Sequence, residues 1–119
     1  MSAFSFVDLI GPTDGPPTIR IRARIRALRT DEGGRRSSIR SGYRPNHNFG
    51  APEAREFYIG QVTVLGLDAV QPGETCEAVV EFINAQGLAA HLVVGRLWRI
   101  QEGPRLVATA EVLEVSREA

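Results

Sequence analysis

Lysine is absent from this 119-residue sequence, and all fourteen of its positively charged side chains are arginines. Without lysine the chain cannot form a Schiff base with a carbonyl substrate. It also has no lysine to reach the phosphates of a nucleotide from a Walker A loop. The sequence therefore predicts neither a nucleotide-driven motor nor a lysine-dependent enzyme.

Cysteine is almost as scarce, since Cys76 is the only one. This count excludes an internal disulfide and a cysteine zinc cluster. The two histidines, His47 and His91, have no ligand-type spacing with cysteine or a carboxylate, so we expect no metal and no cofactor. No apolar run approaches the roughly 20 residues of a membrane span, and the N-terminus lacks a basic leader. We expect a cytoplasmic protein that does not enter a membrane.

What the sequence does contain is a strong alternation of apolar and charged residues from Ile19 to Ala27. Isoleucine or alanine occupies every odd position, and arginine occupies every even position from Arg20 to Arg26. A period of two places the apolar side chains on one face of a strand and the arginines on the other. The segment is therefore predicted to be a half-buried strand with a basic outer stripe.

Further segments are also typical of strands, and none of the chain is a convincing helix. The expected strands are 58–65, 75–83, 92–100 and 106–115, separated by turns rich in glycine and proline. The first apolar segment, Phe4 to Ile10, is short and ends at a Pro/Gly-rich stretch. We expect residues 1–18 to be an extension and linker, and residues 19–116 to be a single all-β domain, either a closed barrel or a sandwich.

Charge is divided unevenly although the formal net charge is zero. Residues 1–50 carry nine arginines and four acids, whereas residues 51–119 carry five arginines and ten acids. This asymmetry predicts a dipolar molecule suited to a polyanion or an oppositely charged protein, unless the charges only solvate the surface.

Four short motifs occur in one order: the loop Asp31-Glu32-Gly33-Gly34-Arg35, the segment Gly42-Tyr43-Arg44-Pro45, the turn Pro72-Gly73 and the hairpin Glu102-Gly103-Pro104-Arg105. Together they resemble the C-terminal, third domain of bacterial elongation factor Tu. The likeness extends from about residue 20 to residue 115. It implies a closed six-stranded antiparallel β-barrel without the GTPase domain or the second domain of that factor, so neither nucleotide binding nor GTP hydrolysis is expected.

The resemblance also implies which residues face tRNA, because the third domain of the family contacts the backbone of the T-arm. The matching positions are Arg35, Glu102 and Gly103, with Asn46 at a position where the family usually has glutamine. The family's threonine contact has no counterpart, since residues 50–56 look like an insertion. Arg99 falls where the family has a small residue against the GTPase domain, so that interdomain surface is not expected to be conserved here.

Two binding functions remain open from the sequence. In the first, a phosphate backbone of RNA is bound by Arg35, Arg36, Arg40 and Arg44, either alone or together with the stripe, although these arginines can equally be a solvated face. In the second, the barrel is a protein-interaction module or a mimic of the family domain, which binds a toxin or regulator or associates with itself, and Trp98, Arg99 and Phe49 form the interface. A lone tryptophan in a strand is alternatively a core residue. No pattern typical of catalysis is found, and the serines near Arg36 lack a nucleophile-elbow motif.

Overall fold

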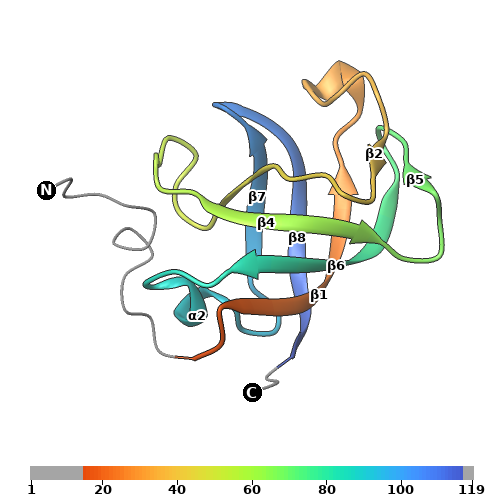
Figure 1. The fold of residues 1–119 in the computed structure, drawn as a ribbon. Coiled ribbons are helices and arrows are strands. Elements are labelled where there is room, and N and C mark those ends of the chain that lie inside the picture. Colours follow the sequence, from red (N-terminus) through yellow and green to blue (C-terminus); the bar gives the residue numbers. More distant parts are fainter. Residues whose placement is uncertain (1–14, 117–119) are drawn as a thin grey trace, which may run out of the picture.

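Six strands form a closed barrel in the computed structural model of the chain, which describes residues 15–116 (Figure 1). Their order around the barrel is β1, β6, β4, β3, β7 and β8, and every pair of neighbours is antiparallel. The strands are β1 (Thr18–Ala27), β3 (Asn46–Asn48), β4 (Tyr58–Val64), β6 (Thr75–Ile83), β7 (Leu97–Glu102) and β8 (Arg105–Ser116). The six-stranded antiparallel barrel expected from the sequence is confirmed.

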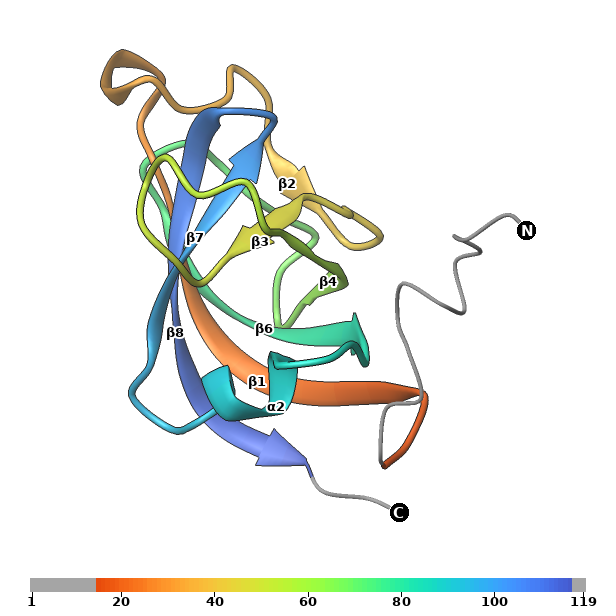
Figure 2. The same cartoon turned by 90° about the vertical axis from the view of Figure 1, so that its left-hand side faces the viewer.

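Four short elements complete the described chain. Strands β2 (Ile39–Arg40) and β5 (Ala69–Val70) form a separate two-stranded sheet. The 3₁₀ turn η1 (Thr30–Glu32) follows β1, and the helix α2 (Leu88–His91) is a single turn. Figure 2 shows α2 at one end of the barrel, and the loop after β1 beside the β7–β8 hairpin at the other. None of the helices in residues 15–116 is long and apolar enough to cross a membrane.

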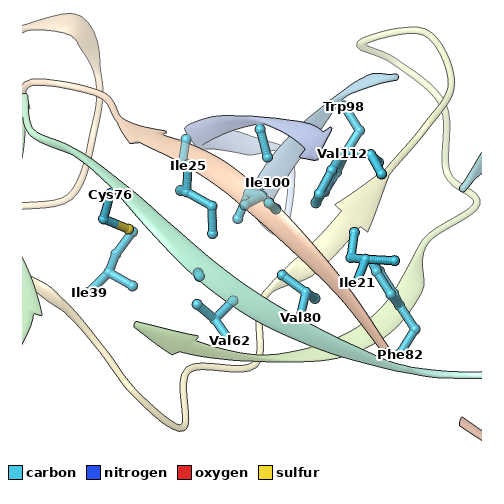
Figure 3. Close-up of a cluster of buried hydrophobic side chains, with 14 of the residues drawn as sticks. Ile21, Ile25, Ile39, Val62, Cys76, Val80, Phe82, Trp98, Ile100 and Val112 are labelled. Carbon is cyan, nitrogen blue, oxygen red and sulfur yellow. The ribbon is translucent and has the colours of Figure 1, made fainter. Parts of the chain in front are cut away.

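The barrel interior is filled by apolar side chains, which alternate with outward-facing residues along the strands. Figure 3 shows such side chains from β1, β6 and β7. On β1, Ile21, Ala23 and Ile25 are buried while the arginines between them are exposed. On β6, every second residue from Cys76 to Phe82 is buried. Because a barrel wall has one dry face, the period of two in the sequence predicts these strands correctly.

One polar side chain, His47 on β3, lies fully buried in this core. Its Nε2 is 3.0 Å from the carbonyl oxygen of Gly60, and its Nδ1 is 3.1 Å from the indole nitrogen of Trp98. The indole N–H can only donate, so Nδ1 accepts and the ring proton sits on Nε2, which donates to Gly60. Burial lowers the pKa of His47 to about 4, so the ring is neutral at pH 7.

The strand predicted at residues 92–100 is displaced, because β7 begins at Leu97. The segment before it contains a turn closed by a hydrogen bond from the amide of Arg96 to the carbonyl oxygen of Val93. Leu92 is buried beside Leu88 of α2, whereas Val93 and Val94 are exposed. The apolar run therefore covers one end of the barrel and does not extend a wall, so the predicted strand boundary is wrong. The only helical elements in residues 15–116 are the short turns η1 and α2. The predicted apolar segment Phe4 to Ile10 lies outside the described residues.

Candidate functional site

The basic stripe of β1 exists, but its charges are matched by carboxylates, on the neighbouring strands for Arg20, Arg22 and Arg24 and in η1 for Arg26. Strand β1 lies between β6 and β8, and both carry glutamates on their outer faces. The ion pairs are Arg20–Glu81 at 3.2 Å, Arg22–Glu77 at 3.6 Å, Arg22–Glu114 at 3.8 Å, Arg24–Glu111 at 3.1 Å and Arg26–Glu32 at 3.1 Å. Strand β1 comes from the basic half of the sequence, whereas β6 and β8 on either side of it come from the acidic half. The charge dipole predicted from the sequence is therefore not found along this wall.

A different basic region lies at the end of the barrel, in the loop that follows β1. The loop is built around η1, where the carboxylate of Glu32 accepts a hydrogen bond from the backbone amide of Arg29 at 2.8 Å. Gly33 then takes a left-handed conformation with φ of 93° and ends the turn. The hydroxyl of Thr30 donates to the carbonyl oxygen of Arg35 at 2.7 Å and closes the loop.

Gly34 fixes the position of this loop against β1. A Cβ atom at this residue would lie 2.3 Å from the carbonyl oxygen of Leu28 and 2.8 Å from that of Arg29. Both atoms belong to the backbone, so no side-chain movement can relieve the contact. The second glycine of the loop is therefore required by packing, and only this residue type lets the loop fold back so closely.

Substitution of Gly34 by alanine is expected to lower the free energy of unfolding by about 2 kcal/mol or more, because the loop must move away from Leu28. Chemical denaturation followed by the fluorescence of the single tryptophan measures the change. Gly33→Asn is the matched control: a Cβ there meets nothing within 4 Å, and the strain of the positive φ, which asparagine bears better than most residues, should cost only about 1 kcal/mol. Equal stability of the two variants would contradict the packing argument.

The side chain of Arg35 extends from this loop and contacts two other segments, the end of β7 and the segment around Tyr43. Its guanidinium group forms an ion pair with Glu102 at the end of β7 and lies 4.6 Å from the centre of the Tyr43 ring. The hydroxyl of Tyr43 donates to the same carboxylate oxygen of Glu102. Arg35 also donates to the hydroxyl of Ser37 at 2.9 Å. We call Arg35, Tyr43 and Glu102 the three-loop cluster.

The cluster shifts the pKa values of its members. Partial burial by itself would raise the pKa of Glu102, but the hydrogen bonds from Tyr43 and Arg35 outweigh it and hold that pKa below its usual range. Burial and the neighbouring carboxylate raise the pKa of Tyr43, so its hydroxyl remains a donor. At neutral pH the cluster therefore holds one carboxylate, one guanidinium and one protonated phenol.

Arg105 links the loop and the hairpin a second time. Its Nε donates to the carbonyl oxygen of Gly33 at 2.9 Å, and its second terminal nitrogen donates to the carbonyl oxygen of Gly34. The hairpin thus holds the loop through Arg105, while the loop holds the hairpin through Arg35. Three of the four motifs singled out in the sequence meet at this end of the barrel.

Four arginines in these segments have no carboxylate within ion-pair distance among residues 15–116. They are Arg36, Arg40, Arg44 and Arg105. Arg36 and Arg40 are exposed, and Arg44 donates twice to the side-chain oxygen of Gln61, at 2.8 and 3.1 Å. Arg36, Arg40 and Arg44 therefore keep a positive charge that no carboxylate of the described residues offsets within ion-pair distance, whereas Arg105 attracts Glu102 and helps to lower the pKa of that carboxyl.

The remaining positions that the resemblance predicts to face tRNA lie beside the cluster. Asn46 begins β3 and is paired in register with Gln101, the residue before Glu102. Gly103 is exposed in the hairpin turn, and its carbonyl oxygen accepts from the side chain of Gln101 at 3.2 Å. The predicted RNA-facing residues are therefore adjacent in the structure. Tyr43, Ser37 and Arg105 belong to the same site but were not singled out, although Tyr43 and Arg105 lie within the motifs.

The predicted protein interface is not a surface. Trp98 is 3% exposed and Phe49 is 6% exposed, and their rings stack with centres 5.1 Å apart inside the barrel. The core interpretation of Trp98 is thus the correct one, and Phe49 is a core residue as well. Arg99 is half-buried and donates to the carbonyl oxygen of Gly50 at 2.9 Å, so it fastens the β3–β4 loop.

The chemistry available at this end of the barrel is the binding of anions. In the part of the chain that the structure describes, no three His, Cys, Asp or Glu side chains gather in a metal-binding group. The guanidinium groups of Arg36 and Arg40 are exposed donors suited to phosphate or carboxylate oxygens. No protein-family model matches this sequence.

Proposed function

We propose that this barrel binds the phosphate backbone of RNA, with tRNA as the ligand that the resemblance to the third domain of elongation factor Tu suggests. The observation that carries the proposal is the contrast between two sets of arginines. Those of the β1 stripe are paired with carboxylates, whereas Arg36, Arg40 and Arg44, in the segments around the three-loop cluster, have no ion pair among residues 15–116. Uncompensated arginines release counterions from a polyanion when they bind it, which favours association.

Recognition through the backbone is supported by the positions of the aromatic side chains. Bases of single-stranded RNA are usually read by stacking on exposed aromatic rings. Of the aromatic side chains among residues 15–116, Phe49, Tyr58, Phe82 and Trp98 are buried, the Tyr43 ring is covered by Arg35, and only Phe57 is partly exposed without such a cover. The proposed contacts are therefore to phosphates, through arginines on folded loops, and do not read sequence.

Fluorescence anisotropy of labelled tRNA at several salt concentrations tests the proposal. The double variant Arg36→Gln/Arg40→Gln is expected to bind about tenfold more weakly than the wild type, with a salt slope reduced by roughly two, because each arginine neutralises about one phosphate. Arg22→Gln/Arg24→Gln is the matched control with the same charge change. It should lose much less affinity, because those arginines already face glutamates.

No saturable binding at low salt, or equal losses in the two double variants, would overturn the RNA proposal.

The second candidate function is then a protein-interaction module, which a separate observation favours. Val93, Val94 and Leu97 are exposed by 51, 69 and 68% at the opposite end of the barrel from the three-loop cluster. Exposed aliphatic side chains close together are more typical of a contact surface than single ones.

A further inference from the structure

Arg35 is the residue that the resemblance places against RNA, yet all of its nitrogens already have acceptors within the protein. Nη1 donates to Glu102, Nη2 donates to the hydroxyl of Ser37 at 2.9 Å, and Nε faces the carbonyl oxygen of Ser37 at 3.4 Å. Stacking on Tyr43 covers one face of the group, and the side chain is only 23% exposed. These bonds and one from Nη2 to the carbonyl oxygen of Ser38 use four of the five N–H groups, so a phosphate that contacts Arg35 at two points must displace one of these acceptors.

Glu102 is the acceptor whose properties match those of a phosphate. It is the only charged partner of Arg35 among residues 15–116, and one of its oxygens accepts hydrogen bonds from both Arg35 and Tyr43. A phosphate oxygen between the same two donors would make the same charge-assisted hydrogen bonds. The other acceptors, Ser37 and Ser38, lie in the loop itself and are neutral.

The carboxylate of Glu102 can also move away from Arg35 without disrupting the fold. Its side chain is 36% exposed, and the residue ends β7 next to the tight turn at Gly103. A change of rotamer would carry the carboxylate into solvent while the backbone pairing of Glu102 with Arg105 stays in place. The exchange therefore needs a side-chain movement and no opening of the barrel.

We propose that Glu102 is an internal counter-ion that occupies the phosphate position of Arg35, so that an RNA phosphodiester must displace it to bind there. This inference rests on the proposed function and adds a regulatory role to it. The carboxylate weakens RNA binding, because it competes for Arg35 and repels an incoming phosphate. It also keeps the guanidinium group in place over Tyr43 while no ligand is bound.

The variant Glu102→Gln tests this role, since an amide keeps an acceptor for Tyr43 and Arg35 but loses the charge. With labelled tRNA in the anisotropy experiment, Glu102→Gln is expected to bind about two- to fivefold more tightly than the wild type. Its salt slope should steepen by about 0.7 to 1, as one more phosphate is neutralised. Thermal unfolding of each variant establishes that the barrel is intact.

Glu111→Gln provides the matched control, because it makes the same charge change and releases Arg24 on the barrel wall. If the two variants gain affinity equally, or if Glu102→Gln binds no more tightly than the wild type, the counter-ion role is wrong while RNA binding stands. If only Glu102→Gln binds, the carboxylate covers Arg35 as proposed, but the wild type does not bind tRNA and the proposed function is wrong. If neither the wild type nor Glu102→Gln binds tRNA, both the inference and the proposed function are wrong.

Discussion

Acidification from pH 7 to pH 4 is expected to lower the free energy of unfolding of the barrel by about 3 kcal/mol through His47 alone. The folded state holds this ring neutral, with a pKa of about 4, whereas in the unfolded chain it takes up a proton near pH 6.5. As the pH falls between these values, the unfolded state binds more protons and is favoured. Protonation would also place a hydrogen on Nδ1, directly opposite the indole N–H of Trp98.

Denaturant unfolding at pH 7, 5.5 and 4 measures this loss. His47→Gln is the control, because an amide can donate to Gly60 but does not titrate, and its stability should fall less between pH 7 and 5. His91, whose pKa is also lowered by burial, contributes in the same direction in both proteins. The pKa values of Glu32 and Glu102 are lowered as well, so protonation of these carboxylates destabilises the fold mainly below pH 4.5.

A direct observation separates His47 from the other groups even if His47→Gln fails to fold. Imidazole resonances in the nuclear magnetic resonance spectrum of the wild type should show a neutral His47 ring with its proton on Nε2 at pH 5.5. A ring that titrates near pH 6.5 in the folded protein would contradict the buried arrangement.

Replacement of Trp98 by alanine is expected to destabilise the barrel by about 3–5 kcal/mol. The indole fills the core between Phe49, at 5.1 Å between ring centres, and Phe82, at 6.2 Å. Its loss also leaves Nδ1 of His47 without its donor. Since a small domain has about 5–15 kcal/mol of stability in total, this loss removes a large share of it and should lower the midpoint of denaturation markedly.

Far-ultraviolet circular dichroism during chemical denaturation follows this variant, which lacks the tryptophan signal. Leu97→Ala changes the preceding residue of the same strand, which is 68% exposed, and should cost less than about 0.5 kcal/mol. Similar losses for the two variants would mean that the indole is not in the core, and the original interface assignment of Trp98 would have to be reconsidered.

The sequence predicts the long strands well because their residues alternate between a dry interior and water. It cannot predict β3, whose sequence Asn-His-Asn is typical of a loop. His47 and Asn48 are buried there only because partners distant in sequence satisfy them, Gly60 and Trp98 for His47 and Gln101 for Asn48. The displaced start of β7 has a related cause, since an apolar run that covers the end of a barrel has the same composition as one in its wall.

The candidate site is only partly visible in the sequence. The loop, the Gly42–Pro45 segment and the hairpin are recognisable as motifs, and the structure brings Arg35, Tyr43 and Glu102 from them into contact. Which arginines are compensated depends on strand order, and no pattern local to β1 shows that glutamates of β6 and β8 will flank it. The stripe is the most conspicuous basic feature of the sequence, but the arginines without a carboxylate partner, such as Arg36 and Arg40, lie in the segment that follows it.

The position of β1 between β6 and β8 also affects how the chain reaches its fold. Arg20 meets Glu81 across 61 residues of sequence, and Arg24 meets Glu111 across 87. The average sequence separation of contacts in this barrel is therefore high, and chains of this kind close slowly, in milliseconds to seconds. During synthesis, the first strand must wait for the last one to leave the ribosome. Until then β1 and β7 both expose unpaired edges, and at that stage the chain is most prone to associate with others.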